Sequence, residues 1–243
     1  NINSTTSGIY FHYGTPDYNY FTNITINHGF DFYTGTTNEF LGRIYFNNVS
    51  DWNGKYLISS ISTPINIDGW TNISGIYLYD SDNSVIQNLN INGEDKYGQA
   101  VFLHTYHSNN VTFTNISVTN YRIGFFVSGW FNDQINFFNL NLSNGYYGLY
   151  HIGSYINSNN ISLNNYTRCI LKTGYSLTIN NSYFSNCNYL ININQQFGNT
   201  YIYDTIYSNS IPILEDQFNS ASACNNIFEN VTDENGKYFL YSN

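Results

Sequence analysis

A short phrase recurs along this chain, and it restricts the fold more than any other feature. Alternating apolar residues lead to an Asn, and two more apolar residues follow it, as in Phe113-Thr114-Asn115-Ile116-Ser117-Val118. The amide or acid of the phrase stands at Asn88, Asn115, Asn139, Asn160, Asn181, Asp204 and Asn225, so successive copies are 21 to 27 residues apart. This period is too short for propeller blades or tetratricopeptide repeats. Its variation is typical of a coil with fixed strands and variable corner loops.

A second phrase, a small residue and a short alternating run, precedes the Asn in several copies. Examples are Gly75-Ile76-Tyr77-Leu78 and Gly124-Phe125-Phe126-Val127. Each repeat therefore holds at least two strands of period 2, joined by polar turns. Stacked at about 4.8 Å per coil, such repeats predict an all-β parallel β-helix of roughly ten coils. We assign residues 44–243 to this solenoid and residues 1–43 to an N-terminal cap or irregular strands of the same domain.

The Asn of each phrase predicts a bend in the chain. Around Asn115 the inward positions are Phe113 and Ile116, so the alternation slips by one residue at the Asn. Asn suits a bend because it tolerates the left-handed backbone region. Stacked coils would align these side chains as an internal asparagine ladder, each amide donating to the next coil and accepting from the previous one. Buried amides are costly without partners, so we expect Asn115 and Asn160 to point inward in a nearly complete ladder.

Asp204 takes an Asn place in this series. It is expected to accept a hydrogen bond from Asn181, and the alternative is that it is one ligand of a bound cation. His151 falls on an inward position, where a buried structural role is more common than catalysis.

Composition excludes several classes of protein. Charged residues make up 9% of the chain and the net charge is −9, so the basic footprint of a nucleic-acid-binding protein is missing. No apolar stretch reaches the roughly 18 residues of a membrane span. The three cysteines, Cys169, Cys187 and Cys224, form no metal-ligand motif and are expected to be small, unpaired buried residues rather than a disulfide framework. The start at Asn1, with no signal sequence, favours a mature or excised segment of an exported protein.

The stacked Asn, the Asn-x-Ser/Thr phrases and the charge-poor composition rich in Tyr and Asn resemble right-handed parallel β-helix repeat proteins. More narrowly, the chain resembles the adhesin-like surface proteins of methanogenic archaea, over about residues 75–230. Asn235-Gly236-Lys237-Tyr238-Phe239-Leu240 also resembles the junctions at which further modules follow in such proteins, and residues 53–58 repeat that phrase. The resemblance implies a right-handed solenoid, but it implies little about function because lyases, tailspikes and adhesins share this architecture.

A catalytic site would need clustered acids, as in polysaccharide-cleaving β-helices. The candidates are Asp80 and Asp82, with His104 and His107 one coil later. The simpler interpretation is a polar turn beside surface histidines. The cysteines and histidines show no nucleophile pair or zinc spacing, and we assign no catalytic, metal or cofactor residues.

Two surface features remain. Successive coils place Tyr77, Phe102, Phe126 and Tyr150 at one outward position, a candidate stripe for ligand or protein contact, although a loop or the N-terminal segment could cover it. Several sequons are expected to face outward as candidate glycosylation sites, at Asn110, Asn141, Asn165, Asn180 and Asn230.

These features together predict a non-catalytic, extracellular cell-surface glycoprotein with an adhesive or structural role. Few charged residues protect the coil edges, so assembly with copies of itself into a filament or sheath is part of this prediction. Other expected partners are glycans or proteins on other cell surfaces, and no nucleic acid. The alternative is a polysaccharide lyase or glycoside hydrolase of the pectate lyase-like type.

Overall fold

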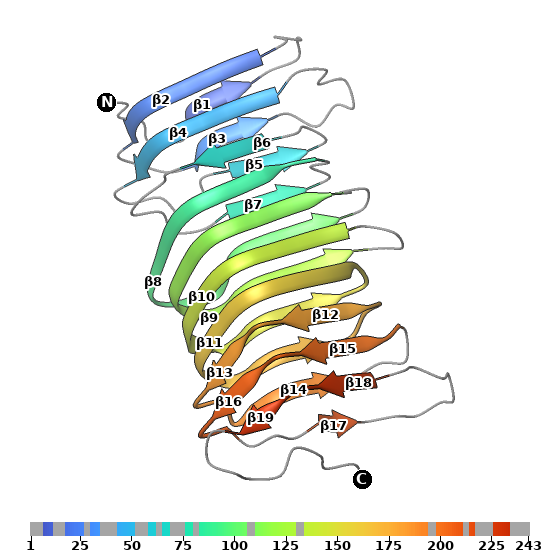
Figure 1. The fold of residues 1–243 in the computed structure, drawn as a ribbon. Helices are drawn as coiled ribbons and strands as arrows, with labels where there is room; N and C mark the ends of the chain where they lie inside the picture. The colour runs from blue at the N-terminus through green and yellow to red at the C-terminus, as the bar shows by residue number, and fades with distance from the viewer. Residues whose placement is uncertain are drawn as a thin grey trace.

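The structure is a computed structural model of the 243-residue chain. It describes residues 7–11, 18–26, 30–34, 43–51, 58–61, 65–68, 76–79, 83–105, 110–129, 134–193, 198–210, 214–216 and 226–233. Before Asp68 it describes the backbone alone. The strands lie side by side from one end of the molecule to the other, and the chain winds through them as a solenoid (Figure 1).

The described elements are all β-strands. The first seven are short or of moderate length: β1 (Ser7–Phe11), β2 (Tyr18–Ile26), β3 (Phe30–Thr34), β4 (Arg43–Asp51), β5 (Ile58–Ile61), β6 (Ile65–Asp68) and β7 (Ile76–Tyr79). Four long strands follow: β8 (Val85–Thr105), β9 (Val111–Gly129), β10 (Gln134–Ile152) and β11 (Tyr155–Lys172). The rest are short again: β12 (Leu177–Asn180), β13 (Tyr183–Ser185), β14 (Tyr189–Ile193), β15 (Thr200–Tyr203), β16 (Ile206–Ser208), β17 (Leu214–Asp216), β18 (Asn226–Glu229) and β19 (Thr232–Asp233).

The pairings show that each long strand is three short ones joined at bends. β8 pairs in parallel with β9, β9 with β10 and β10 with β11. Successive parts of β11 then pair with the separate strands β12, β13 and β14. One turn therefore has a first side (residues 156–159 in β11), a middle side (161–164) and a third side (168–172). The described strands form a parallel β-solenoid of about five turns.

The variable part of the repeat lies between the third side and the next first side. The sequence predicts variable corner loops, but not which corner varies. β8 ends at Thr105 and β9 begins at Val111, whereas only Gly153 and Ser154 separate β10 from β11. The repeats of the first third align as well, since Phe21 pairs with Phe46 and Ile24 with Val49. The boundary at residue 43 stays a prediction.

The core fills the space between the sides. Phe113 and Phe137 come from first sides and Phe125 from a third side, and their ring centroids lie 5.1 to 5.5 Å apart. All three rings are at most 1% exposed. Burial of a side chain of this size contributes about 1.5–3 kcal/mol, so the apolar columns of successive coils supply most of the stability.

The predicted bends are confirmed. The residues between first and middle sides have positive φ, from 47° to 57°, at Asn88, Asn115, Asn139, Asn160, Asn181 and Asp204. A left-handed residue turns the chain by breaking the alternation, which is why Phe113 and Ile116 both point into the core. Asn reaches this region at lower cost than most residues.

The stacked hydrogen bonds are also confirmed, but the ladder is not internal. Asn115 Nδ2 donates to Asn88 Oδ1, Asn139 to Asn115 and Asn160 to Asn139, at 2.8 to 2.9 Å. These side chains are exposed, Asn115 and Asn160 included, so their expected inward orientation is wrong. At a left-handed corner the residues two before and one after the Asn take the inward positions, as Phe113 and Ile116 do, and the Asn side chain is left outside. Each amide donates to the preceding coil, opposite to the expected direction.

A second ladder stands at the corner between middle and third sides, where the sequence analysis placed none. The residues at this corner follow the first series by five residues, also with positive φ: Asn120, Asn144, Asn165, Asn186 and Asn209. Asn144 donates to Asn120 at 3.1 Å and Asn165 to Asn144 at 2.9 Å. The middle side is thus a four-residue strand between two asparagine corners, and the spacing of five residues was readable in the sequence.

Aspartate side chains take the first position in two series of the stacked hydrogen bonds of the first ladder. Asn88 Nδ2 donates to Asp68 Oδ1 at 2.6 Å, and Asn230 Nδ2 donates to Asp204 Oδ1 at 2.9 Å. An ionised carboxylate only accepts hydrogen bonds. Asp204 therefore accepts from the following coil. Its expected hydrogen bond from Asn181 is wrong, because Asn181 Nδ2 donates to Asn159 Oδ1 at 3.2 Å. Asn225 lies outside the described residues, and its expected place in register is taken by Asn230.

Candidate functional site

One row of the third side carries aromatic residues in successive coils. Tyr77 pairs with Phe102, Phe102 with Phe126 and Phe126 with Tyr150. The side chains of Tyr77 and Phe102 lie outside the description. Those of Phe126 and Tyr150 are half-buried, with ring centroids 4.9 Å apart. The next residue in the row is Leu171, so the described stripe ends in the turn of Tyr150.

Further tyrosines and two arginines extend this row into a surface. The Tyr147 ring lies 5.2 Å from Tyr150 and 4.5 Å from Tyr146. Arg168 Nη1 donates to the Tyr147 hydroxyl at 2.9 Å. The Arg168 guanidinium carbon also lies 5.7 to 5.8 Å from the ring centroids of Tyr146, Tyr147 and Tyr189. We call this set the Tyr–Arg surface: Arg122, Phe126, Tyr146, Tyr147, Tyr150, Arg168 and Tyr189.

Arg122 completes the surface from the preceding coil. Its guanidinium carbon lies 5.9 Å from the Tyr146 ring centroid, and that of Arg168 lies 5.8 Å from the same centroid. Both cations thus contact one ring, an arrangement that contributes about 0.5–1 kcal/mol per exposed pair. Among the residues that the structure describes, neither arginine has a carboxylate partner, and Arg168 Nε is buried without a hydrogen bond. Two of the seven Lys and Arg residues therefore meet here without a neutralising carboxylate in the described part of the chain.

The electrostatics of Tyr150 reflect this environment. Partial burial raises the pKa of its hydroxyl, and the neighbouring Tyr147 raises it further. The hydroxyl consequently stays protonated at neutral pH and presents a donor as well as an acceptor.

A shallow pocket adjoins the surface at the second asparagine corner. It has a volume of about 330 Å³ and is lined by Asn144, Gly145, Asn165, Tyr166, Thr167, Asn186 and Asn188. Gly145, Thr167 and Asn188 directly precede Tyr146, Arg168 and Tyr189 in the chain. The pocket and the Tyr–Arg surface are therefore continuous across three adjacent strands.

Glycine is required beneath this pocket. A Cβ on Gly145 would lie 2.1 Å from Tyr121 O and 2.6 Å from the Tyr166 ring. Tyr121 and Tyr166 fill the core before and after it and are at most 4% exposed. Burial strongly raises the pKa of Tyr166, so this phenol remains neutral. The buried rings of Tyr121 and Tyr166 therefore pack directly beneath the pocket residues.

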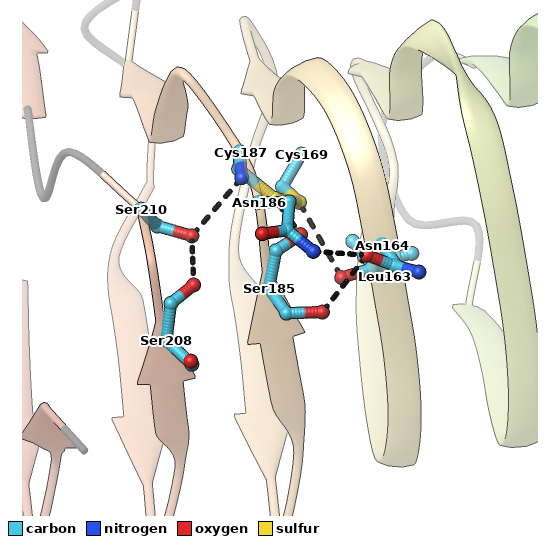
Figure 2. Close-up of a disulfide and its surroundings, with 8 residues drawn as sticks. All are labelled: Leu163, Asn164, Cys169, Ser185, Asn186, Cys187, Ser208 and Ser210. Atoms are coloured by element: carbon cyan, nitrogen blue, oxygen red, sulfur yellow. Dashed lines mark hydrogen bonds between the residues drawn. A yellow bond between two sulfur atoms is a disulfide. The ribbon is translucent and has the colours of Figure 1, made fainter.

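Two of the cysteines are joined, so the expectation of unpaired buried cysteines is wrong for them. Cys169 on the third side of β11 forms a disulfide with Cys187, which follows the bend at Asn186, and their Cα atoms lie 5.7 Å apart. Figure 2 shows the bond and the hydrogen bonds around it. Both residues are buried as expected, but they occupy different columns of the repeat and meet diagonally across the corner. Cys224 lies outside the described residues.

The disulfide lies next to the residues of the site. Cys169 follows Arg168, and Cys187 precedes Asn188. Around it, Asn186 Nδ2 and Ser185 Oγ both donate to Asn164 Oδ1, at 2.9 and 3.0 Å, and Cys187 N donates to Ser210 Oγ at 3.1 Å (Figure 2). The covalent link and these bonds fix neighbouring turns at the pocket.

His151 is buried, as the sequence predicts. It lies in register with Lys172, whose Nζ donates to Gly198 O at 3.1 Å. The imidazole Nε2 donates to Ser154 O at 2.7 Å, because a carbonyl only accepts. Burial lowers the pKa of His151 to about 3; the bond to Ser154 opposes this shift and the Lys172 charge adds to it. His151 is therefore a neutral interior residue.

The five sequon asparagines differ in whether their side chains are hydrogen-bonded to another coil. Asn110 donates to Asn83, Asn165 to Asn144 and Asn230 to Asp204, so these three exposed amides are hydrogen-bonded. Asn141 is exposed on the middle side and Asn180 is half-buried at the end of β12. Glycan attachment at any of them stays a prediction.

The candidate catalytic cluster lies largely outside the description. Asp80, Asp82 and His107 are not among the described residues, and His104 is placed only as a β8 residue paired with Tyr79 and Ser128. In the described part of the chain, no group of three His, Cys, Asp or Glu side chains is arranged to hold a metal ion. The described residues also form no helix that is long and apolar enough to cross a membrane.

The contact of Arg168 with its neighbouring tyrosines could have been predicted from the repeat spacing. Tyr147, Arg168 and Tyr189 are 21 residues apart and pair directly, so stacking at that period predicts their contact.

Comparisons with family models, curated proteins and solved structures find no match for this chain.

Proposed function

We propose that this chain is part of an exported, non-catalytic cell-surface β-solenoid that makes adhesive contacts through one lateral face. In this proposal the coil is right-handed and continues to about ten coils, as in the archaeal adhesin-like proteins that the sequence resembles. The observation that carries the proposal is the Tyr–Arg surface. Half-buried rings on the outside of a coil, beside guanidinium groups that no described carboxylate neutralises, are typical of binding surfaces.

Two further features support this proposal. The Cys169–Cys187 disulfide favours export, because such bonds persist mainly in oxidising compartments. Exposed amide ladders on two corners, Asn115 to Asn139 and Asn120 to Asn144 among them, join the coils without using charge. A scaffold of this kind keeps a fixed surface in a variable external medium, since amide–amide bonds do not depend on pH or strongly on salt.

Labelling of intact cells tests the proposal. An antibody raised against the chain is expected to label unpermeabilised cells of the native source, with immunogold particles at the cell boundary. Label that requires permeabilisation would contradict a surface location. Light scattering on native material tests the proposed self-assembly, since a filament or sheath requires particles much larger than the monomer.

A further inference from the structure

We infer that the Tyr–Arg surface and the pocket beside it bind a carboxylate-bearing sugar residue of an acidic glycan. This inference rests on the proposed adhesive function and names the chemistry of its ligand.

The rings provide an apolar platform of the right size. Tyr146 is 37% exposed, and Tyr147 and Tyr150 are half-buried beside it. Apolar ring faces bind the C–H faces of pyranose rings, while the tyrosine hydroxyls bond to sugar hydroxyls. Since Tyr147 is held by Arg168 at 2.9 Å, the platform is ordered before a ligand arrives, which lowers the entropic cost of binding.

The two arginines distinguish an acidic sugar from a neutral one. Arg122 and Arg168 both lie within 6 Å of the Tyr146 centroid, and no described carboxylate neutralises them. Guanidinium groups bind carboxylates through paired, charge-assisted hydrogen bonds. A carboxylate on a sugar that contacts the exposed edge of Tyr146 would therefore lie within reach of both cations.

The net charge of −9 does not oppose this contact at physiological salt. Charges beyond a Debye length of about 8 Å are largely screened, so the nearby arginines dominate the local field. A polyanion of high charge density would meet many more of the chain's carboxylates. The ligand is consequently expected to carry spaced carboxylates.

The pocket supplies polar groups for the neighbouring sugar. Thr167 and Asn188 line it, and no hydrogen bond of either side chain occurs within the described part of the chain. Their hydroxyl and amide match the hydroxyls of a second ring. The pocket volume of about 330 Å³ is at the lower limit for a bound small ligand, which fits one sugar unit.

Calorimetric titration with a matched pair of oligosaccharides tests the inference. One contains glucuronic acid, and the other contains glucose at the same position. We expect the acidic member to bind at least about tenfold more tightly, since charge-assisted bonds exceed neutral ones by that factor. R168Q and R122Q should each reduce this preference. Y146S should weaken both ligands, and Y183S, which alters a tyrosine also 37% exposed, should change neither.

Each contrary result has a distinct meaning. Equal binding of both oligosaccharides overturns the acidic ligand and leaves the adhesive proposal intact. Binding of a glutamate-rich peptide in place of either sugar also overturns the inference, since the ligand is then a protein. No binding of any of these ligands overturns the inference as well, and surface labelling of cells then judges the proposed function separately.

Discussion

Asn139 Nδ2 donates to Asn115 Oδ1 at 2.9 Å, although both side chains are exposed. The two residues lie in adjacent coils with φ of 55° and 56°. The same residue therefore supplies the backbone conformation of the corner and the hydrogen bond between coils. These two contributions can be separated by mutation.

Substitution of Asn139 by Gly or by Ala separates the bend from the ladder. Both variants lose the bonds to Asn115 and Asn160, which costs roughly 0.5–1.5 kcal/mol per bond. N139A also forces Ala into the left-handed region, at a further cost of about 1–2 kcal/mol, whereas Gly adopts it freely. Urea unfolding should therefore rank N139A as the less stable variant. Equal losses would show that the left-handed conformation contributes nothing at this corner.

Conversion of Asp204 to Asn should stabilise the chain. Asp204 accepts from Asn230 but has no donor for the preceding coil, and D204N gains an Nδ2 group directed toward Asn181. One net hydrogen bond of roughly 0.5–1.5 kcal/mol is expected, seen as a higher melting temperature. E229Q is the control, because it removes an exposed negative charge nearby without adding to the ladder. A similar gain in both variants would assign the effect to charge.

Because His151 is buried in its neutral form, we expect the free energy of unfolding to fall in weak acid. Its pKa in the folded chain is about 3, below the usual value of about 6.5 in an unfolded chain. Between these values the unfolded state binds a proton that the folded state does not, so stability falls as pH falls. The loss approaches about 1.4 kcal/mol per pH unit below pH 6.5.

Denaturant unfolding between pH 6.5 and 5 measures this slope, above the range in which most carboxylates titrate. The H151Q variant removes the titrating group and should show a flatter dependence on pH. A slope as steep in H151Q as in the wild type would show that another group is responsible.

The disulfide predicts sensitivity to reduction. Cys169 and Cys187 are 18 residues apart, and closing a loop of this length stabilises a chain by about 3 kcal/mol in the entropic account. Dithiothreitol should therefore lower the melting temperature of the wild type and leave that of C169S/C187S unchanged. C224S is the matched control and should keep the response to reductant. Because the bond adjoins Arg168 and Asn188, the double variant should also bind the acidic oligosaccharide more weakly.

Several features of the fold followed from the sequence because their causes are local. The left-handed preference of Asn115 and its counterparts gives the bend, and the alternation around Phe113 and Ile116 gives the inward columns. Direct stacking was predictable too, since parallel coils pair residues at a fixed spacing. The aromatic row of Tyr77, Phe102, Phe126 and Tyr150 was found in this way, whereas the row of Tyr147, Arg168 and Tyr189 needed the same argument applied to charged residues.

Other features depend on directions that a repeat pattern does not contain. The first ladder is exposed because the left-handed Asn115 stands between the inward residues Phe113 and Ile116, so its own amide is turned to the outside. Cys169 and Cys187 stand in different columns and meet only because two inward side chains converge across a corner. The sequence by itself determined the period, the bends and the core. The tertiary structure decided which polar side chains face outward and which distant residues meet, because those outcomes depend on how successive coils are rotated and packed.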